Sequence, residues 1–337
     1  IWKNQSIQRH LTARPIMRQL FTLSCSFVLA FALAAAQAQS FPTKPVRIVI
    51  GFPPGGGIDI VARILSPKLT ESFGQQVIVD NRAGTNGIIA ADLVAKAPPD
   101  GYTIYLGTTG NLSVNPNLYA TLPFNIERDF APLTQTSSVP FLLYVNPNVP
   151  AKTLGDLVAH ARANPGKVHF YSSGNGGLPH LAGELMNTVA GIKTVHVPYK
   201  GSSPGLNDLI GGQVQFGFDA VAIGLPHVKS GRLRALATTG KQRLSFLPEV
   251  PSASETLAGF EVVNWYGMVV PAGTPRDVIA RLHTEIVKAM NIPEIHEKLV
   301  AQGTDPVGSA PEEFGAFMKS ETIKWGRVIK TANIRAD

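Results

Sequence analysis

The chain has 337 residues, of which 44% are hydrophobic and 16% are charged. A composition this apolar can bury a core, which excludes a disordered chain. The formal charge of +7 overstates the charge of the folded part, because residues 1–38 hold four basic residues and no acidic one, which leaves 26 basic and 23 acidic residues. No run of lysine and arginine alternates with aromatic residues, so we expect no nucleic-acid partner.

Residues 1–38 have the pattern of an export signal. Arg18 precedes an apolar run over residues 20–36, and Ala36-Gln37-Ala38 is a small-x-small cleavage site. We expect cleavage to a mature chain that starts near Gln39 in the periplasm. The alternative is an uncleaved membrane anchor, for which the apolar run is short.

The chain contains a single cysteine, Cys25, which lies inside this expected signal. After cleavage the protein would have no thiol. We therefore expect no disulfide and no thiolate metal site.

The first element of the expected mature chain is an apolar strand over residues 46–50. It leads into the glycine-rich segment 53–59. A helical pattern follows at once, with one apolar face made of Ile58, Val61, Ala62, Leu65 and Leu69. The segment therefore predicts a strand, a glycine loop and a helix N-terminus.

Further strands and helices alternate along the chain. Strand patterns occupy residues 77–79, 102–106, 130–137, 140–145, 168–171, 194–197, 214–218, 233–237 and 262–270. Helical patterns occupy residues 88–96, 181–189 and 206–210, and further helices begin after Thr153, Thr274 and Ser309. Thr274 is expected to cap its helix, with Pro275 at the first helical position.

This alternation predicts an α/β fold with mainly parallel sheets flanked by helices. Two apolar runs, 140–145 and 262–270, separate two such sets and are expected to cross between them. We expect one lobe formed by residues 41–139 and 261–337 and a second formed by residues 140–260. Glycine-rich loops after strands would then face a cleft between the lobes, which closes by hinge bending.

The loop at 53–59 suits a small anion, because glycines leave backbone N–H groups uncovered and a helix N-terminus adds partial positive charge. A nucleotide site is disfavoured, since the loop lacks the Gly-Lys-Ser/Thr ending and the full G-x-G-x-x-G spacing. A purely structural tight turn stays an alternative.

A second glycine-rich loop, residues 172–177, also precedes a helix. Its serine hydroxyls beside bare amides suit a carboxylate, and helix capping alone is the alternative reading. Asp219 ends a strand in an apolar setting, where it either caps the next helix or faces the cleft.

Ser172 or Ser173 with His180 could support a periplasmic hydrolase, which is our alternative function. No G-x-S-x-G elbow is present, so we expect no enzyme activity. No H-E-x-x-H motif or other metal-ligand spacing appears, and we expect neither a metal nor a cofactor.

Several segments, taken in order, resemble the tripartite tricarboxylate transporter substrate-binding receptors, also called the Bug family. The likeness covers residues 41–337. It rests on Val79-Asp80-Asn81-Arg82-Ala83-Gly84, Pro99-Asp100-Gly101-Tyr102-Thr103, Ser172-Ser173-Gly174-Asn175-Gly176, His180-Leu181-Ala182-Gly183-Glu184, His196-Val197-Pro198-Tyr199-Lys200-Gly201, Pro248-Glu249-Val250-Pro251 and Pro271-Ala272-Gly273-Thr274-Pro275, together with the first glycine loop.

The resemblance implies a two-lobed periplasmic binding protein of type II, the Venus flytrap fold. It implies a monomer that captures a small organic carboxylate for a membrane permease of the tripartite tricarboxylate type, or for a sensor kinase. The loops that it assigns to the ligand contain Pro53, Pro54, Gly55, Gly56, Gly57, Ile58, Asp59, Thr108, Thr109, Asn111, Ser172, Ser173, Gly174, Asn175, His180, Tyr199, Lys200, Ser202 and Asp219.

Three positions depart from the family pattern: Ile58, Pro54 and Leu178-Pro179 before His180. Small polar residues or alanine are usual there. The changes remove hydroxyl groups and add apolar surface, which predicts a ligand with an aromatic or partly apolar body besides its carboxylate.

Overall fold

The computed structural model describes residues 41–199, 201–244 and 246–335. The chain divides into two compact units, Ile1–Thr43 and Lys44–Asp337, and the fold below is that of the second. The expected export signal and Cys25 lie outside the described residues. A search of the described part of the chain finds no helix with the length and hydropathy needed to span a bilayer.

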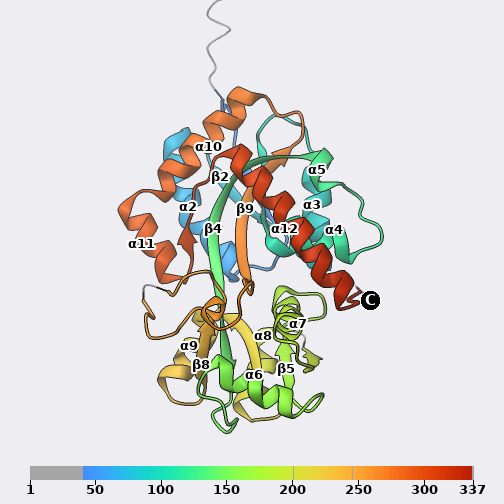
Figure 1. Ribbon diagram of the computed structural model, residues 1–337. Coiled ribbons are helices and arrows are strands. Elements are labelled where there is room, and N and C mark those ends of the chain that lie inside the picture. The colour runs from blue at the N-terminus through green and yellow to red at the C-terminus, as the bar shows by residue number, and fades with distance from the viewer. Residues whose placement is uncertain (1–40, 200, 245, 336–337) are drawn as a thin grey trace, which may run out of the picture. The chain divides into compact units, whose positions relative to one another are not determined.

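The strands follow the predicted order (Figure 1). They are β1 (Val46–Ile50), β2 (Val77–Asn81), β3 (Thr103–Thr108), β4 (Phe130–Val145), β5 (His169–Ser172), β6 (Val195–Pro198), β7 (Phe216–Ala220), β8 (Arg234–Thr238), β9 (Val263–Pro271) and β10 (Asp305–Pro306).

The helices lie between these strands and at the C-terminal end. They are α2 (Gly57–Phe73), α3 (Ile88–Ala95), α4 (Asn115–Leu118), α5 (Ile126–Asp129), α6 (Leu154–Ala163), α7 (Leu178–Ala190), α8 (Ser202–Ile210), α9 (Val221–Lys229), α10 (Arg276–Met290), α11 (Pro293–Ala301) and α12 (Pro311–Thr331).

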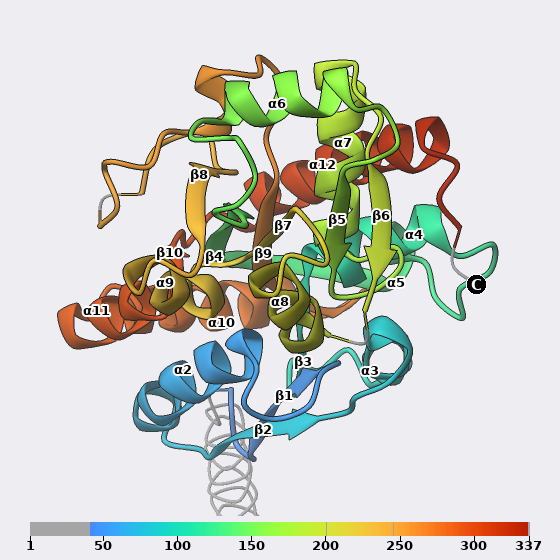
Figure 2. The same ribbon diagram turned by 90° about the horizontal axis from the view of Figure 1, so that it is seen from below.

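The sheet order is β2-β1-β3-β9-β4-β7-β5-β6, with β8 and β10 also paired to β4. Strands β1, β2 and β3 run parallel, as do β5, β6 and β7, and Figure 2 shows β5 and β6 side by side. The crossing strands β4 and β9 run antiparallel to each other and to their other neighbours. The parallel sets are therefore joined by antiparallel crossings.

The prediction of separate strands at 130–137 and 140–145 is wrong, because both belong to the continuous strand β4. Its first part, up to Pro140, pairs with β9, and its last residues, from Phe141, pair with β7 and β8. Pro140 lies where the strand changes partners, a position that tolerates the missing N–H of proline. Pro140 therefore marks a change of partner rather than the start of a new strand.

Helix α2 forms because its apolar residues repeat at helical spacing. All five residues predicted for its inner face are buried, namely Ile58, Val61, Ala62, Leu65 and Leu69. Each large aliphatic side chain buried there contributes about 1.5–3 kcal/mol. Burial of this face holds the N-terminus of α2 at the end of β1.

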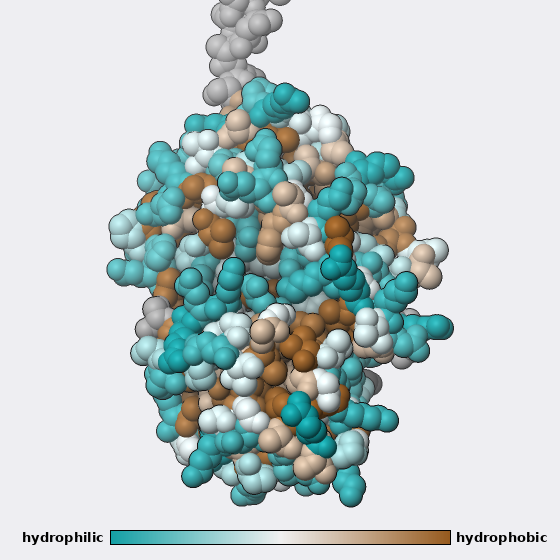
Figure 3. All heavy atoms as spheres, in the orientation of Figure 1, coloured by the Kyte–Doolittle hydropathy of each residue, from teal (hydrophilic) through white to brown (hydrophobic). Residues whose placement is uncertain are grey.

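Helix α12 contacts α4, β4 and α7. Its residues Trp325, Val328 and Ile329 share a buried apolar cluster with Phe170 and Leu181. The C-terminal part of the chain therefore packs against elements expected in the second lobe. In the face shown in Figure 3, apolar side chains also gather over α7 on an otherwise largely hydrophilic surface.

A buried carboxylate ties α12 to the crossing strand β9. Glu321 accepts hydrogen bonds from the indole nitrogens of Trp265 and Trp325, at 3.2 and 2.9 Å. Because both indoles are fully buried, this carboxylate satisfies donors that would otherwise have no partner.

Some helix signals were misread. Thr274 does not cap α10: Pro275 occupies the cap position, and the Thr274 hydroxyl donates to the carbonyl of Pro271 at 2.7 Å. Helices α9 and α11 were not predicted. Helix α9 contains Gly224 and Pro226 in its interior. These residues oppose helix formation locally, so tertiary packing decides the outcome.

Candidate functional site

The first glycine loop is built around the carboxylate of Asp59. Asp59 as a whole is only 2% exposed, whereas residues 53–57 are exposed. One of its oxygens accepts from the Gly55 N–H and from Nε of Arg63, both at 2.9 Å, and the other accepts from Nδ2 of Asn81 at 3.0 Å. Asp59 therefore shapes the loop, and as an ionised carboxylate it offers no donor to an anionic ligand.

Burial by itself would raise the pKa of Asp59, but the hydrogen bonds from Arg63, Gly55 and Asn81 together outweigh it and hold the pKa below its ordinary value. The ion pair with Arg63 also compensates the negative charge beside the helix N-terminus. The first-turn N–H groups of Gly57 and Ile58 have no acceptor among the described residues. These amides can receive an anion.

Ile58 itself is buried, at 4% exposure, on the inner face of α2. The apolar residues that the loop offers to solvent are Pro53 and Pro54. Ile58 can reach a ligand with its backbone N–H, while its side chain packs in the core.

The loop after β3 is fixed by a set of amide side chains. Asn111 accepts from the N–H and hydroxyl of Thr108, at 3.1 and 3.2 Å, and donates to the carbonyl of Asn86 at 2.7 Å. Thr109 accepts from the N–H of Trp265 at 2.9 Å. The predicted residues Thr108, Thr109 and Asn111 are thus brought together, and their hydrogen bonds fix the backbone of neighbouring loops.

Two polar residues that the sequence did not single out lie beside this region. Tyr266 of β9 stands directly opposite Thr108 of β3 and Ser137 of β4, so the three side chains share one face of the sheet. The Tyr266 hydroxyl lies 2.9 Å from where a Cβ on Gly57 would be. No sequence signal could have found this tyrosine, because it lies within an apolar run expected to be a crossing strand.

The second glycine loop is held by two histidines. The hydroxyl of Ser172 lies 2.6 Å from Nε2 of His196 and 2.8 Å from the carbonyl of Gly174. The N–H of Gly176 donates to Nδ1 of His180 at 3.1 Å. Ser172 thus pairs with His196 and not with His180, contrary to the pairing considered for a hydrolase.

Burial depresses the pKa of both imidazoles. The pKa of His180 falls to about 4, and that of His196 falls to about 3, with a further contribution from the neighbouring His180. Both rings are therefore neutral at physiological pH and act as hydrogen-bond partners rather than as cations.

The remaining predicted residues of this region belong to two hydrogen-bonded sets, one around Asp219 and one around Tyr199. Asp219 is buried, which raises its pKa, and the bonds that it accepts from Ser202, the Ala220 N–H and the Tyr171 hydroxyl partly offset that rise. The Tyr199 N–H donates to the carbonyl of Ser172 at 3.0 Å, and its hydroxyl donates to Asp208 at 2.6 Å. Lys200 lies outside the described residues.

The structure gathers the predicted residues into two groups. One contains loops 53–59 and 108–111, and the other contains Ser172, Ser173, Gly174, His180, Tyr199, Ser202 and Asp219. Asn175 is exposed and donates to the carbonyl of Arg335. Over the described ranges no hydrogen bond joins loop 53–59 to loop 172–177. In the same ranges no group of three or more His, Cys, Asp or Glu side chains could hold a metal ion.

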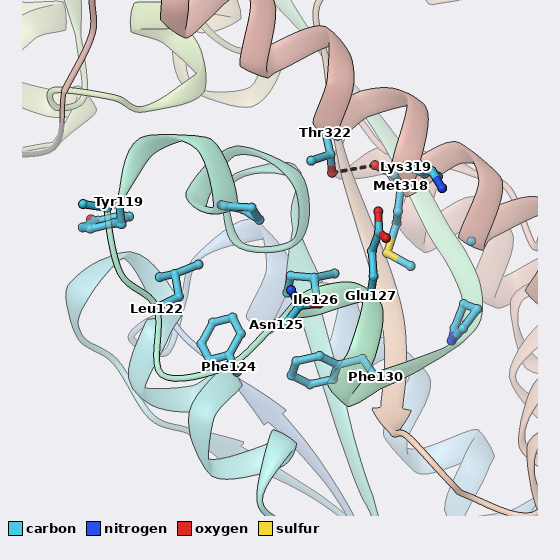
Figure 4. Close-up of a pocket in the computed structure, with 14 residues that line it drawn as sticks. Tyr119, Leu122, Phe124, Asn125, Ile126, Glu127, Phe130, Met318, Lys319 and Thr322 are labelled. Atoms are coloured by element: carbon cyan, nitrogen blue, oxygen red, sulfur yellow. Dashed lines mark hydrogen bonds between the residues drawn. The ribbon is translucent and has the colours of Figure 1, made fainter.

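A cavity of about 410 Å³ lies elsewhere, between α12 and the segment before β4 (Figure 4). Its walls include Tyr119, Leu122, Phe124, Phe130 and Met318. None of the predicted ligand-binding residues lines it.

Curated relatives cover nearly the whole chain. A protein encoded in the tcbD-tcbE intergenic region of Pseudomonas sp. strain P51 is 43% identical over 314 residues, which is 92% of this chain and 93% of the relative. BugT of Bordetella pertussis is 34% identical over 317 residues, covering 93% of this chain and 97% of BugT.

Solved structures share the fold. A protein of R. palustris solved with adipate is 35% identical, with a TM-score of 0.77, and the match covers 88% of this chain and 99% of that one. MatC from Rhodopseudomonas palustris, solved with bound malate, is 28% identical with a TM-score of 0.73, covering 86% of this chain and all of MatC. The fold is thus the α/β fold of two-lobed periplasmic binding proteins, as predicted.

The family model described as the tripartite tricarboxylate transporter family receptor matches residues 61–334. Receptors of this kind bind solutes and are not enzymes, which confirms the expectation of a binding protein over a hydrolase. The chain belongs to the tripartite tricarboxylate transporter receptor family, in which Bug proteins are its relatives.

Proposed function

We propose that this protein captures a small organic carboxylate in a cleft between its lobes and delivers it to a membrane permease of the tripartite tricarboxylate type. The observation that carries the proposal is the N-terminus of α2, where the N–H groups of Gly57 and Ile58 lack an acceptor among the described residues. A negative ligand group there gains both hydrogen bonds and the favourable field of the helix.

The ligands named for two relatives support a carboxylate. Adipate and malate are both small dicarboxylates, and each was found with a protein at least 28% identical to this chain. The second loop would provide the other side of the site. Three of its amides, those of Gly174, Gly176 and Gly177, already have partners inside the chain, so it offers fewer free donors than the first loop.

The proposal of a partly apolar ligand rests on Pro53 and Pro54, which are exposed on the first loop. Ile58 and Leu178 are buried and do not supply open apolar surface. A ligand with an aromatic or aliphatic body would cover the two proline rings when its carboxylate reaches the amides.

We propose that residues 41–139 and 261–337 form one lobe and that residues 140–260 form the other. The change of partners at Pro140 in β4 supports the first boundary. The apolar contacts between α12 and α7 add a second connection between the lobes besides the crossing strands. Closure around the ligand would therefore move α12 as well as β4 and β9.

A binding screen tests the function. Thermal shifts are measured with aliphatic and aromatic mono-, di- and tricarboxylates, followed by calorimetry on each compound that shifts the melting temperature. At a ligand concentration of 100 times Kd, a single-site ligand adds about 2.7 kcal/mol to the free energy of unfolding. The bound compound should be recovered unchanged.

Absence of binding by every carboxylate, or turnover of the compound, would overturn the proposal. Much tighter binding of citrate or aspartate than of aromatic acids would remove only the proposed apolar part. Size-exclusion chromatography checks the expected monomer. N-terminal sequencing of periplasmic protein checks for a mature start near Gln39.

A further inference from the structure

We propose that the hydroxyl of Tyr266 donates a third hydrogen bond to the ligand carboxylate held by the Gly57 and Ile58 amides, and so makes the site selective for a carboxylate over a carboxamide. The inference rests on the proposed function, and it assigns a role to a residue of the crossing strand β9.

The Tyr266 hydroxyl lies close to Gly57 in the first turn of α2. A Cβ on Gly57 would lie 2.9 Å from this oxygen, which is too close for a real side chain. The phenol therefore reaches the first turn of α2, beside the two free amides. Glycine at this position leaves the space that the hydroxyl occupies.

The hydroxyl also lacks a hydrogen-bond partner in the described part of the chain. Tyr266 is 7% exposed, and its side-chain oxygen takes part in no hydrogen bond there. Ser137, directly opposite on β4, is fully buried, and its hydroxyl likewise lacks a partner. Unlike the Ser137 hydroxyl, the Tyr266 oxygen keeps some contact with solvent, so a ligand in the site can reach it and accept its hydrogen bond.

The chemistry of the three donors decides which ligand group fits. Burial raises the pKa of Tyr266 to about 12, so the phenol keeps its proton at neutral pH. The nearby carboxylate of Asp59 is already occupied by Gly55, Arg63 and Asn81. A carboxylate offers only acceptors to this set of donors, whereas a carboxamide would direct its own N–H groups toward them.

The test compares two proteins and paired probes. The variant Tyr266→Phe removes only the hydroxyl. Its matched control is Tyr119→Phe, a half-buried tyrosine that lines the cavity beside α12. The probes are adipate, malate and benzoate, each with its carboxamide analogue, and affinities are measured by calorimetry.

Wild type and Tyr119→Phe should bind at least one acid and discriminate strongly against its amide. In Tyr266→Phe the affinity for that acid should fall about ten- to a hundred-fold, while affinity for the amide changes little. The acid-to-amide ratio compares two probes on one protein, so it does not depend on the stability of the variant.

An unchanged ratio in Tyr266→Phe, with wild type still binding the acid, would overturn the role of Tyr266 and leave the receptor function intact. Failure of wild type to bind these three acids and every other carboxylate of the binding screen would overturn both.

Discussion

The imidazole rings of His180 and His196 are stacked, with their centroids 3.6 Å apart and their planes 9° from parallel. Each ring also bonds a different part of the second glycine loop, His196 through the Ser172 hydroxyl and His180 through the Gly176 N–H. Two neutral imidazoles therefore hold that loop in shape. Protonation of either ring would place a charge in a buried position, next to the stacked partner ring.

Acid should destabilise the protein through this pair. Unfolded imidazoles take up protons below about pH 6.5, whereas burial lowers the folded pKa values to about 4 and about 3. Between these limits the unfolded state binds more protons, so the free energy of unfolding falls as pH falls, by up to about 1.4 kcal/mol per pH unit for each proton. Urea unfolding from pH 7.5 to 4 measures this decline.

The decline should shrink in His196→Gln and persist in His160→Gln, which removes a histidine outside the pair. The carboxylate of Glu184, 3.9 Å from His180, is the charged group that could oppose the effect. A stability that stays level from pH 6.5 to 4 would show that the folded pair accepts protons without cost.

Replacing Asp59 by asparagine should loosen the first glycine loop. The change removes the charge that Arg63 pairs with and puts an N–H₂ group where an oxygen accepts hydrogen bonds. We expect the free energy of unfolding to fall by about 1–2 kcal/mol and carboxylate affinity to fall with it. Urea unfolding and calorimetry measure both. Glu71→Gln, in an exposed pair on the same helix, is the control and should change neither.

Alanine at Gly57 should weaken ligand binding while leaving the fold intact. Its Cβ would lie 2.9 Å from the Tyr266 hydroxyl and would push the phenol away from the first turn of α2. Gly56→Ala is the matched control, because its Cβ would meet only the Pro53 carbonyl, at 3.9 Å, and its φ of −78° suits alanine. We expect at least a tenfold loss of carboxylate affinity in Gly57→Ala by calorimetry. Equal affinities in the two variants would contradict this.

Ser137→Ala should stabilise the protein. The serine hydroxyl is buried without a partner in the described residues, and removing such a group recovers its desolvation cost, on the order of 1 kcal/mol. The neighbouring Thr136→Val serves as the contrast, because the Thr136 hydroxyl donates to the carbonyl of Tyr266 at 3.1 Å. Chemical unfolding should show a gain for the first variant and a loss for the second. A loss in both would indicate that Ser137 has a solvent partner.

Much of the fold could be predicted because its signals are local. The capping box of α6 joins Thr153 and Asp156, three residues apart, and both of its hydrogen bonds are present. The apolar face of α2 follows from helical spacing alone. By contrast, the continuity of β4 through Pro140 depends on pairing with strands far away in the sequence, so the local pattern at 130–145 did not predict it.

The first glycine loop shows the division most clearly. The sequence by itself determined a strand, exposed glycines and a helix N-terminus, since these depend on neighbouring residues. Only the tertiary structure decided that Asp59 closes the loop, that Tyr266 reaches Gly57, and that Ser172 pairs with His196. The last two contacts arise from sheet pairing and loop packing between distant segments, and no periodicity or spacing along the chain encodes them.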